Sequence, residues 1–227
     1  MPNNNAGLVA KSFAVYIKDM RLELRTRNAL NAILMFGVTT LTVVSFSLGQ
    51  SGLQPKLLAA LFWVIMFFSA MSGLAQTFIR EEETGTSLAL RLTADPDAIY
   101  VGKLFFNLTL LSMLSIIITP LFFVFTDAPT DNVLMFIVVL FLGVVGLCAA
   151  TTIVAAIIAK ASVKGALFAV LSFPILMTLL MSLVNATEKI FDNQNFSAYQ
   201  AEFNFLIAYC VVMITASVLL FKFVWQE

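Results

Sequence analysis

The sequence predicts an all-α membrane protein with six transmembrane helices, and two observations carry this prediction. The 227 residues are 60% hydrophobic and only 11% charged, whereas soluble domains are about 25% charged. Six apolar runs contain no Asp, Glu, Lys or Arg, and each has about the 18 or more residues that a helix needs to cross a hydrocarbon core of about 30 Å. The runs cover residues 29–48, 57–78, 104–125, 133–159, 166–183 and 203–221.

Composition also argues against several classes of function. The chain has no His, so the commonest metal ligand, haem ligand and general base are missing. Gly102-Lys103 has no upstream glycine at the spacing of a phosphate-binding loop and is followed by Leu104. The net charge is zero, so the composition does not indicate the basic surface that nucleic-acid binding needs. The apolar runs also lack the charges of a proton-coupled transporter. We therefore expect a non-catalytic membrane subunit that binds no cofactor directly.

Residues 8–27, before the first apolar run, predict an amphipathic helix. Its apolar residues recur at steps of three and four, which places them on one helical face: Val9, Phe13, Tyr16, Ile17, Met20 and Leu24. Lys11, Lys18, Arg21, Arg25 and Arg27 occupy much of the remainder. A basic amphipathic helix beside a span is typical of a helix lying in the membrane interface. The alternative is a simple charge cluster that orients the first span.

The distribution of Lys and Arg predicts that both termini are cytoplasmic. With the N-terminus inside, the inner segments hold eleven of the 13 basic residues: five in the N-terminal region, three in 79–103, two in 160–165, and Lys222. Only Lys56 and Lys189 remain outside. An excess of Lys and Arg marks the cytoplasmic side.

The outer segment 184–202 is long and of mixed composition. It predicts a short helix on the outer surface, in which aromatic and apolar side chains anchor at the interface. The candidate anchors are Ile190, Phe191, Phe196 and Tyr199.

The longest polar segment between two apolar runs is Arg80–Lys103, and it begins with an unfavourable charge pattern. Arg80, Glu81, Glu82 and Glu83 follow the second run directly. Carboxylates at the C-terminal end of a helix oppose its dipole, by about 0.3–1 kcal/mol each when exposed. A pattern that breaks a local rule indicates a candidate functional site. The alternative is a solvated helix end in which Arg80 offsets part of the cost, and the charges alone do not decide between the two.

The rest of this segment predicts a short helix between two breaks. Thr84-Gly85-Thr86 is a break, and Leu88 and Leu92 lie one helical turn apart on an apolar edge. Asp95-Pro96-Asp97 is a strong start for the next helix, with an N-cap, a proline and an acid in the first turn. A short helix with apolar anchors suits docking into a groove on a partner; a plain surface linker is the alternative.

Several stretches together resemble a known family, the CcmB haem exporter permeases of cytochrome c-type biogenesis, within the ABC-2-type permeases. They are KDMRLELRTR at 18–27, FIREEETGT at 78–86, DPDAIYVGKLFFN at 95–107, TPLFF at 119–123, GVVGLCAATTIVAAI at 143–157 and SFPIL at 172–176. The resemblance covers nearly the whole chain. Ser87-Leu88-Ala89 stands where the family often has an acidic residue.

The resemblance implies a single ABC-2-type transmembrane domain over residues 1–227 in the bacterial inner membrane. It implies a second copy of the chain, a separate CcmA-like ATPase that binds ATP, CcmC-like and CcmD-like haem-handling membrane proteins, and a periplasmic haem chaperone. The family's coupling loop corresponds to Arg80, Glu81, Glu82, Glu83, Gly85, Thr86, Leu88, Leu92, Asp95, Pro96 and Lys103. Its interfacial helix corresponds to Phe13, Tyr16, Ile17, Met20, Arg21 and Leu24.

This resemblance implies a permease that couples ATP hydrolysis on a partner to cytochrome c maturation. The coupled event is either export of haem, the candidate substrate, or release of a haem-loaded chaperone. A permease for another amphiphile, such as a lipid-linked glycan or a drug, is the alternative of the same class. A membrane scaffold for haem-handling proteins, without a transport path, is the alternative of a different class.

Overall fold

The computed structural model describes residues 7–48, 54–74, 76–128, 131–159 and 164–226, and all regular secondary structure in these ranges is helical. The helices in this part of the chain are, in order, α1 (Leu8–Thr26), α2 (Asn28–Leu48), α3 (Pro55–Leu74), α4 (Gln76–Glu83), α5 (Ser87–Thr93), α6 (Pro96–Thr126), α7 (Val133–Ile158), α8 (Lys164–Phe191) and α9 (Phe196–Gln226).

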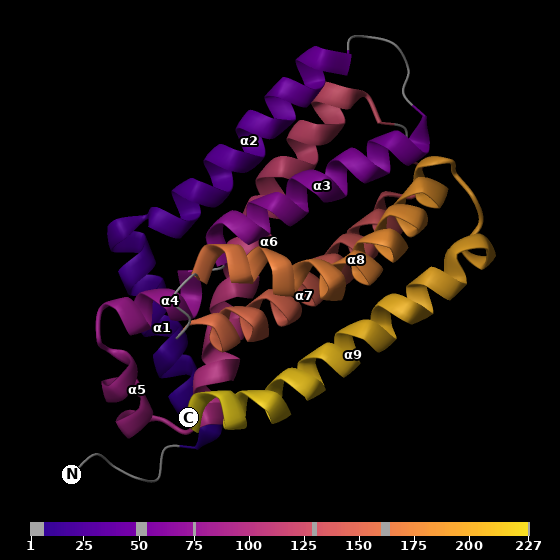
Figure 1. Cartoon of the computed structure of the whole chain (residues 1–227). Coiled ribbons are helices and arrows are strands. Elements are labelled where there is room, and N and C mark those ends of the chain that lie inside the picture. Colours follow the sequence, from indigo (N-terminus) through magenta and orange to yellow (C-terminus); the bar gives the residue numbers. More distant parts are fainter. Residues whose placement is uncertain (1–6, 49–53, 75, 129–130, 160–163, 227) are drawn as a thin grey trace.

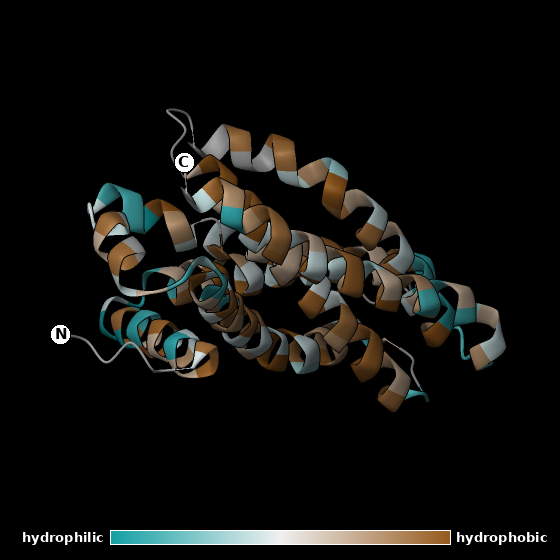
Figure 2. Cartoon of the chain, turned by 90° about the horizontal axis from the view of Figure 1, so that it is seen from below, coloured by the Kyte–Doolittle hydropathy of each residue, from teal (hydrophilic) through white to brown (hydrophobic). Residues whose placement is uncertain are grey.

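Six helical stretches within the described ranges are long and apolar enough to cross a membrane: α2, α3 together with α4, α6, α7, α8 and α9. They run side by side as a bundle, and the start of α1 and the end of α9 lie at the end of the bundle where α4 and α5 gather (Figure 1). Hydrophilic residues concentrate toward the two ends, with a mainly hydrophobic stretch between them (Figure 2). The predicted all-α fold with six membrane-spanning helices is therefore confirmed.

Helix α7 lies at the centre of the bundle and packs against α3, α4, α6, α8 and α9. Small residues along α7 permit this close packing. A Cβ added at Gly143 would lie 2.2 Å from the Trp63 ring, and one at Gly146 would lie 2.9 Å from Leu179. Helices α2 and α9, by contrast, leave large apolar side chains such as Phe46 and Phe223 exposed, as expected for surfaces that face lipid.

The prediction of a separate surface helix within 184–202 is wrong. Helix α8 continues to Phe191, and α9 begins at Phe196. Of the predicted interface anchors, only Phe196 is exposed, whereas Ile190, Phe191 and Tyr199 are buried. The physical reason is aromatic packing: the Phe191 ring stacks on Phe136, with centroids 5.6 Å apart. Most of the segment therefore belongs to the ends of two long helices, which are joined by a short turn at residues 192–195.

Helix α1 packs across α6 at this end of the bundle mainly through a face next to the predicted apolar one, although Tyr16 and Met20 of the apolar face also pack against the core. Its fully buried residues are Ser12, Val15, Asp19 and Glu23. The predicted interfacial residues line the adjacent face: Phe13 and Leu24 are exposed, Tyr16, Ile17 and Met20 are half-buried, and Arg21 is exposed. Phe13 and Leu24 are thus exposed apolar residues of the kind that a helix at a membrane surface would present to lipid.

Gly102 of α6 sets the distance between α1 and α6. A Cβ at this position would lie 2.6 Å from the Ser12 carbonyl oxygen and 2.8 Å from the Val15 Cβ. The Ser12 oxygen belongs to the backbone of α1, so the clash is relieved only if α1 shifts as a whole. We expect Gly102→Ala to lower the free energy of unfolding by about 1–3 kcal/mol, measured as thermal unfolding of the purified chain in detergent.

The matched control is Gly7→Ala, because a Cβ there meets nothing within 4 Å. Hydrogen–deuterium exchange should localise the effect of Gly102→Ala to α1. Equal melting temperatures for the Gly102→Ala and Gly7→Ala variants would contradict the close approach.

Candidate functional site

The polar segment between the second and third spans folds as two short helices and a turn. Helix α4 ends at Glu83, and Gly85 adopts the left-handed conformation with φ of 69°, which glycine tolerates without strain. Helix α5 follows and is anchored by Leu90, whose side chain is buried in an apolar cluster with Phe78 and Ile99. The predicted break and short helix are both present.

Pro96 is the first residue of α6, and Asp95 holds the predicted N-cap position. The Asp95 side chain does not cap the helix, however. It accepts a 2.8 Å hydrogen bond from Lys11 Nζ of α1 instead. This hydrogen bond and the positive charge of Lys11 lower the pKa of Asp95. The predicted position is correct, but the side chain joins α1 to α6 and does not cap α6.

A largely buried group of two lysines and two carboxylates lies where α1, α4 and α6 meet; we call Lys18, Asp19, Glu81 and Lys103 the Lys103 cluster. The Lys103 side chain is only 1% exposed. Its ammonium donates three hydrogen bonds, each 3.0 Å long, to Asp19 Oδ2, Glu81 Oε1 and the Thr77 carbonyl oxygen. All three of its donors are thus satisfied. The ammonium also lies 5.1 Å from the centre of the Phe78 ring.

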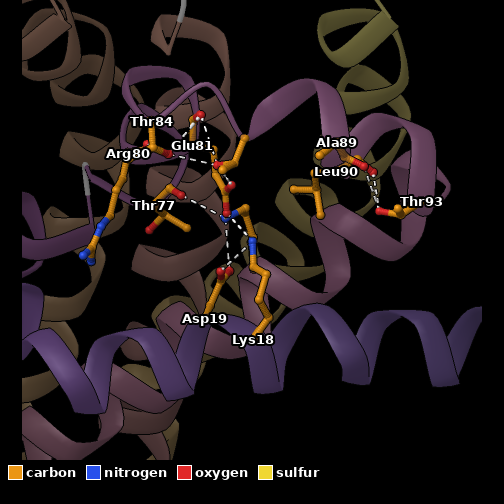
Figure 3. Close-up of polar contacts among 11 residues, drawn as sticks. Lys18, Asp19, Thr77, Arg80, Glu81, Thr84, Ala89, Leu90 and Thr93 are labelled. Atoms are coloured by element: carbon orange, nitrogen blue, oxygen red, sulfur yellow. Dashed lines mark hydrogen bonds and ion pairs between the residues drawn. The ribbon is translucent and has the colours of Figure 1, made fainter.

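Lys18 completes the charge balance of this cluster from α1. Its ammonium contacts Glu81 Oε1 and lies 3.1 Å from Asp19 Oδ1. Burial alone would lower the pKa of Lys18, but the Asp19 and Glu81 carboxylates outweigh that effect and raise it. The second Glu81 oxygen accepts a 2.6 Å hydrogen bond from the Thr86 hydroxyl, at the start of α5. Figure 3 shows Asp19 and Lys18 from α1 approaching Glu81 of α4.

A chain of hydrogen bonds extends from the cluster into the centre of the bundle. The Thr77 hydroxyl donates to Asn107 Oδ1 over 2.7 Å, and Asn107 Nδ2 donates to the Thr152 hydroxyl over 2.8 Å. Asn107 and Thr152 are fully buried. Because a buried amide is costly when unpaired, these bonds fix α4, α6 and α7 relative to one another.

Arg80 points away from the Lys103 cluster (Figure 3). Its guanidinium lies 3.9 Å from Glu23 Oε2 and makes long hydrogen bonds of 3.3 and 3.4 Å to the Thr26 hydroxyl. Glu23 in turn accepts a 2.8 Å hydrogen bond from the Leu30 backbone N–H in the first turn of α2. A carboxylate at a helix N-terminus interacts favourably with the helix dipole. The compensation expected from Arg80 is therefore directed at Glu23, while Lys18 and Lys103 neutralise Glu81.

The remaining predicted residues separate into an outer and an inner set. Leu88 and Leu92 are 66% and 80% exposed and form the outward edge of α5. Glu83, Gly85, Thr86 and Asp95 are also exposed, and Glu82 and Pro96 are half-buried. Glu81 and Lys103 are buried. The structure brings Glu81, Thr86 and Lys103 together and leaves the two leucines facing outward.

Sequence reasoning missed several residues of the site, namely Lys18, Asp19, Glu23, Thr77 and Asn107. A signal for two of them was present in the sequence. Asp19 and Glu23 lie four residues apart on an otherwise basic helix. Anionic headgroups repel carboxylates, so these two residues were candidates for contact with protein. Within the described residues, no group of three or more Cys, Asp or Glu is arranged to hold a metal ion.

Comparison with protein families gives a match over nearly the whole chain. The family model described as CcmB protein matches residues 10–224, a range that includes the Lys103 cluster, α5 and most of α1 and α9. A search of curated proteins found no match.

Replacing Lys103 by methionine should destabilise the protein strongly. Asp19 and Glu81 would then share only Lys18, and breaking a buried ion pair by removing one partner costs about 3–5 kcal/mol. The measurement is the midpoint of thermal unfolding in detergent. Adding Glu81→Gln to Lys103→Met should recover part of the loss, because the second change removes the uncompensated charge.

The control is Lys189→Met, since Lys189 pairs with Glu202 in a partly exposed position and exposed pairs contribute at most about 1 kcal/mol. If Lys103→Met were no more harmful than Lys189→Met, the central role of the buried ammonium would be refuted.

Proposed function

Because the chain belongs to the CcmB family, and so is a membrane permease component of the haem export system of cytochrome c maturation, we propose that it transmits the action of a separate ATPase to the membrane through α5. On this proposal, Arg80–Lys103 is the coupling loop of a single ABC-2-type transmembrane domain. The chain itself hydrolyses no ATP.

The observation that carries the proposal is the outward edge of α5. Leu88 and Leu92 are one helical turn apart and highly exposed, at the end of the bundle where α9 ends. Large apolar side chains that project from a polar segment indicate a docking surface. A helix with apolar residues at this spacing suits insertion into an apolar groove of a partner.

The Lys103 cluster supports a mechanical role for this edge. Thr86 leads into α5 and bonds to Glu81, which shares the Lys103 ammonium with Asp19. A displacement of α5 therefore acts on α4, α6 and α1 together. The bonds through Thr77, Asn107 and Thr152 extend the same connection to α7. A packed and fully bonded junction transmits motion because it resists continuous deformation.

The excess of Lys and Arg on one side of the spans supports the proposed orientation: the end that carries α1, α4 and α5 faces the cytoplasm, where an ATPase is accessible. The membrane is the bacterial inner membrane, and α1 lies at its cytoplasmic surface. A second copy of the chain, a CcmA-like ATPase, CcmC-like and CcmD-like membrane proteins and a periplasmic haem chaperone are the proposed partners. ATP binds to the ATPase, and haem enters as the substrate of the system.

Replacing Leu88 and Leu92 together by aspartate should uncouple the chain from its ATPase. Charged side chains would enter an apolar groove, so we expect loss of co-purification with the ATPase, together with loss of c-type cytochromes in cells. The folded chain should remain, because both positions are exposed. Thr93→Asp is the matched control: it adds a charge to the same helix at an exposed position without removing an apolar side chain.

Normal cytochrome levels and an intact complex in the Leu88→Asp/Leu92→Asp variant would contradict the coupling role. ATPase activity in the isolated chain would separately contradict its assignment as a non-catalytic subunit.

A further inference from the structure

A cleft of about 310 Å³ opens beside the Lys103 cluster. Its walls come from α1, α4 and α6 and from the ends of α2 and α3 nearest α1, so it lies at the proposed level of the cytoplasmic headgroups. The volume is at the lower end of the range of about 300–1,000 Å³ that is typical of pockets for small ligands. Leu22, Ala29 and Phe106 supply apolar wall.

The wall of the cleft contains a carboxylate oxygen with spare capacity to accept a hydrogen bond. The Glu23 side chain is only 4% exposed. Its Oε1 accepts the Leu30 N–H, whereas the contact of Oε2 among the described residues is Arg80 Nη1 at 3.9 Å. That distance is too long for a hydrogen bond. An ammonium group that enters the cleft can donate a hydrogen bond to Oε2, and hydrogen bonds between two charged groups are among the strong ones.

The rim of the cleft carries two cations with spare hydrogen-bonding capacity. The Arg80 side chain is 32% exposed, and its two long hydrogen bonds go to a single hydroxyl, that of Thr26. A guanidinium has five N–H donors, so most of its donors remain for an anion. Lys18 is also partly exposed at this rim. The cleft is therefore negative at the Glu23 wall and positive at the rim.

We propose that this cleft binds a zwitterionic headgroup that carries a primary ammonium and a phosphate, as in phosphatidylethanolamine. The ammonium donates to Glu23 Oε2, and the phosphate accepts from Arg80 and Lys18. A purely anionic headgroup fits less well, because Asp19, Glu23 and Glu81 all line the cleft. A choline headgroup lacks N–H donors and leaves Oε2 unpaired. The site is independent of whether α5 docks on an ATPase.

The first test uses the full-length wild-type chain in detergent, with native mass spectrometry to measure lipid binding. Four lipids with identical acyl chains are titrated: phosphatidylethanolamine, its N-methyl and N,N-dimethyl derivatives, and phosphatidylcholine. We expect affinity to fall as N–H donors are lost, with phosphatidylcholine about tenfold weaker than phosphatidylethanolamine, since hydrogen bonds to charged groups contribute about that factor. Equal affinity across the series overturns the proposal.

Two variants assign the roles of the wall and the rim. Glu23→Gln keeps an acceptor for the Leu30 N–H but removes the charge, so it should abolish the preference for phosphatidylethanolamine over phosphatidylcholine. Arg80→Gln should weaken both lipids by a similar factor, because both carry the phosphate. Glu188→Gln and Arg25→Gln make the same changes outside the cleft and should leave binding unaltered. A Glu23→Gln protein with an unchanged preference refutes the site, and the wild-type series decides the question if that variant does not fold.

A final arm distinguishes the sources of the headgroup. Soluble glycerophosphoethanolamine that displaces the lipid identifies the headgroup alone as the ligand. Failure to displace it, when phosphatidylethanolamine itself is bound with the expected preference, identifies a lipid of the bilayer.

Discussion

The ammonium of Lys103 is the interaction on which the rest of this end of the molecule depends. Three helices meet around it, because each supplies either the ammonium itself or an oxygen that accepts one of its hydrogen bonds. Helix α1 supplies Asp19, α4 supplies Glu81 and the Thr77 carbonyl, and α6 carries Lys103 itself. A buried charge is tolerated only when it is paired and fully hydrogen-bonded. Separating any one of the three helices from the other two would therefore leave buried charges without partners, at a large cost in free energy.

That constraint explains the amphipathic character of α1. A helix that only lay on lipid would need one apolar face and one polar face. Helix α1 has three: an exposed apolar face that includes Phe13 and Leu24, a buried face with Asp19 and Glu23, and a basic face with Arg21 and Arg25. The acidic face packs on protein, whereas the exposed apolar residues and the basic residues are those that a helix at an anionic membrane surface would use. The close approach at Gly102 makes the protein-facing contact possible.

Much of the fold could be predicted from the sequence, because long uncharged apolar runs have few structural solutions in lipid. The break at Gly85, the short helix with Leu88 and Leu92 and the start at Pro96 were also predictable, since local turn and capping chemistry determines them. The Lys103 cluster was not predictable. Its partners lie far away in the sequence, and nothing local shows that Glu81 faces Lys18 while Arg80 faces Glu23. The outer ends of α8 and α9 were misinterpreted for a related reason: the mixed composition suggested a separate surface helix, whereas the burial of Phe191 against Phe136 is a tertiary contact.

The separation of Asp19 from Lys103 by 84 residues also governs how the protein is made. At about 5–20 residues per second, α1 leaves the ribosome on the order of ten seconds before the helix that completes its ion pairs. During that interval Asp19 lacks Lys103 and must stay hydrated, so we expect the first helix to remain at the aqueous surface while α2 and α3 insert. The docking of α1 is therefore a late step of assembly. The membrane topology is established first, and the Lys103 cluster that holds α1 in place forms afterwards.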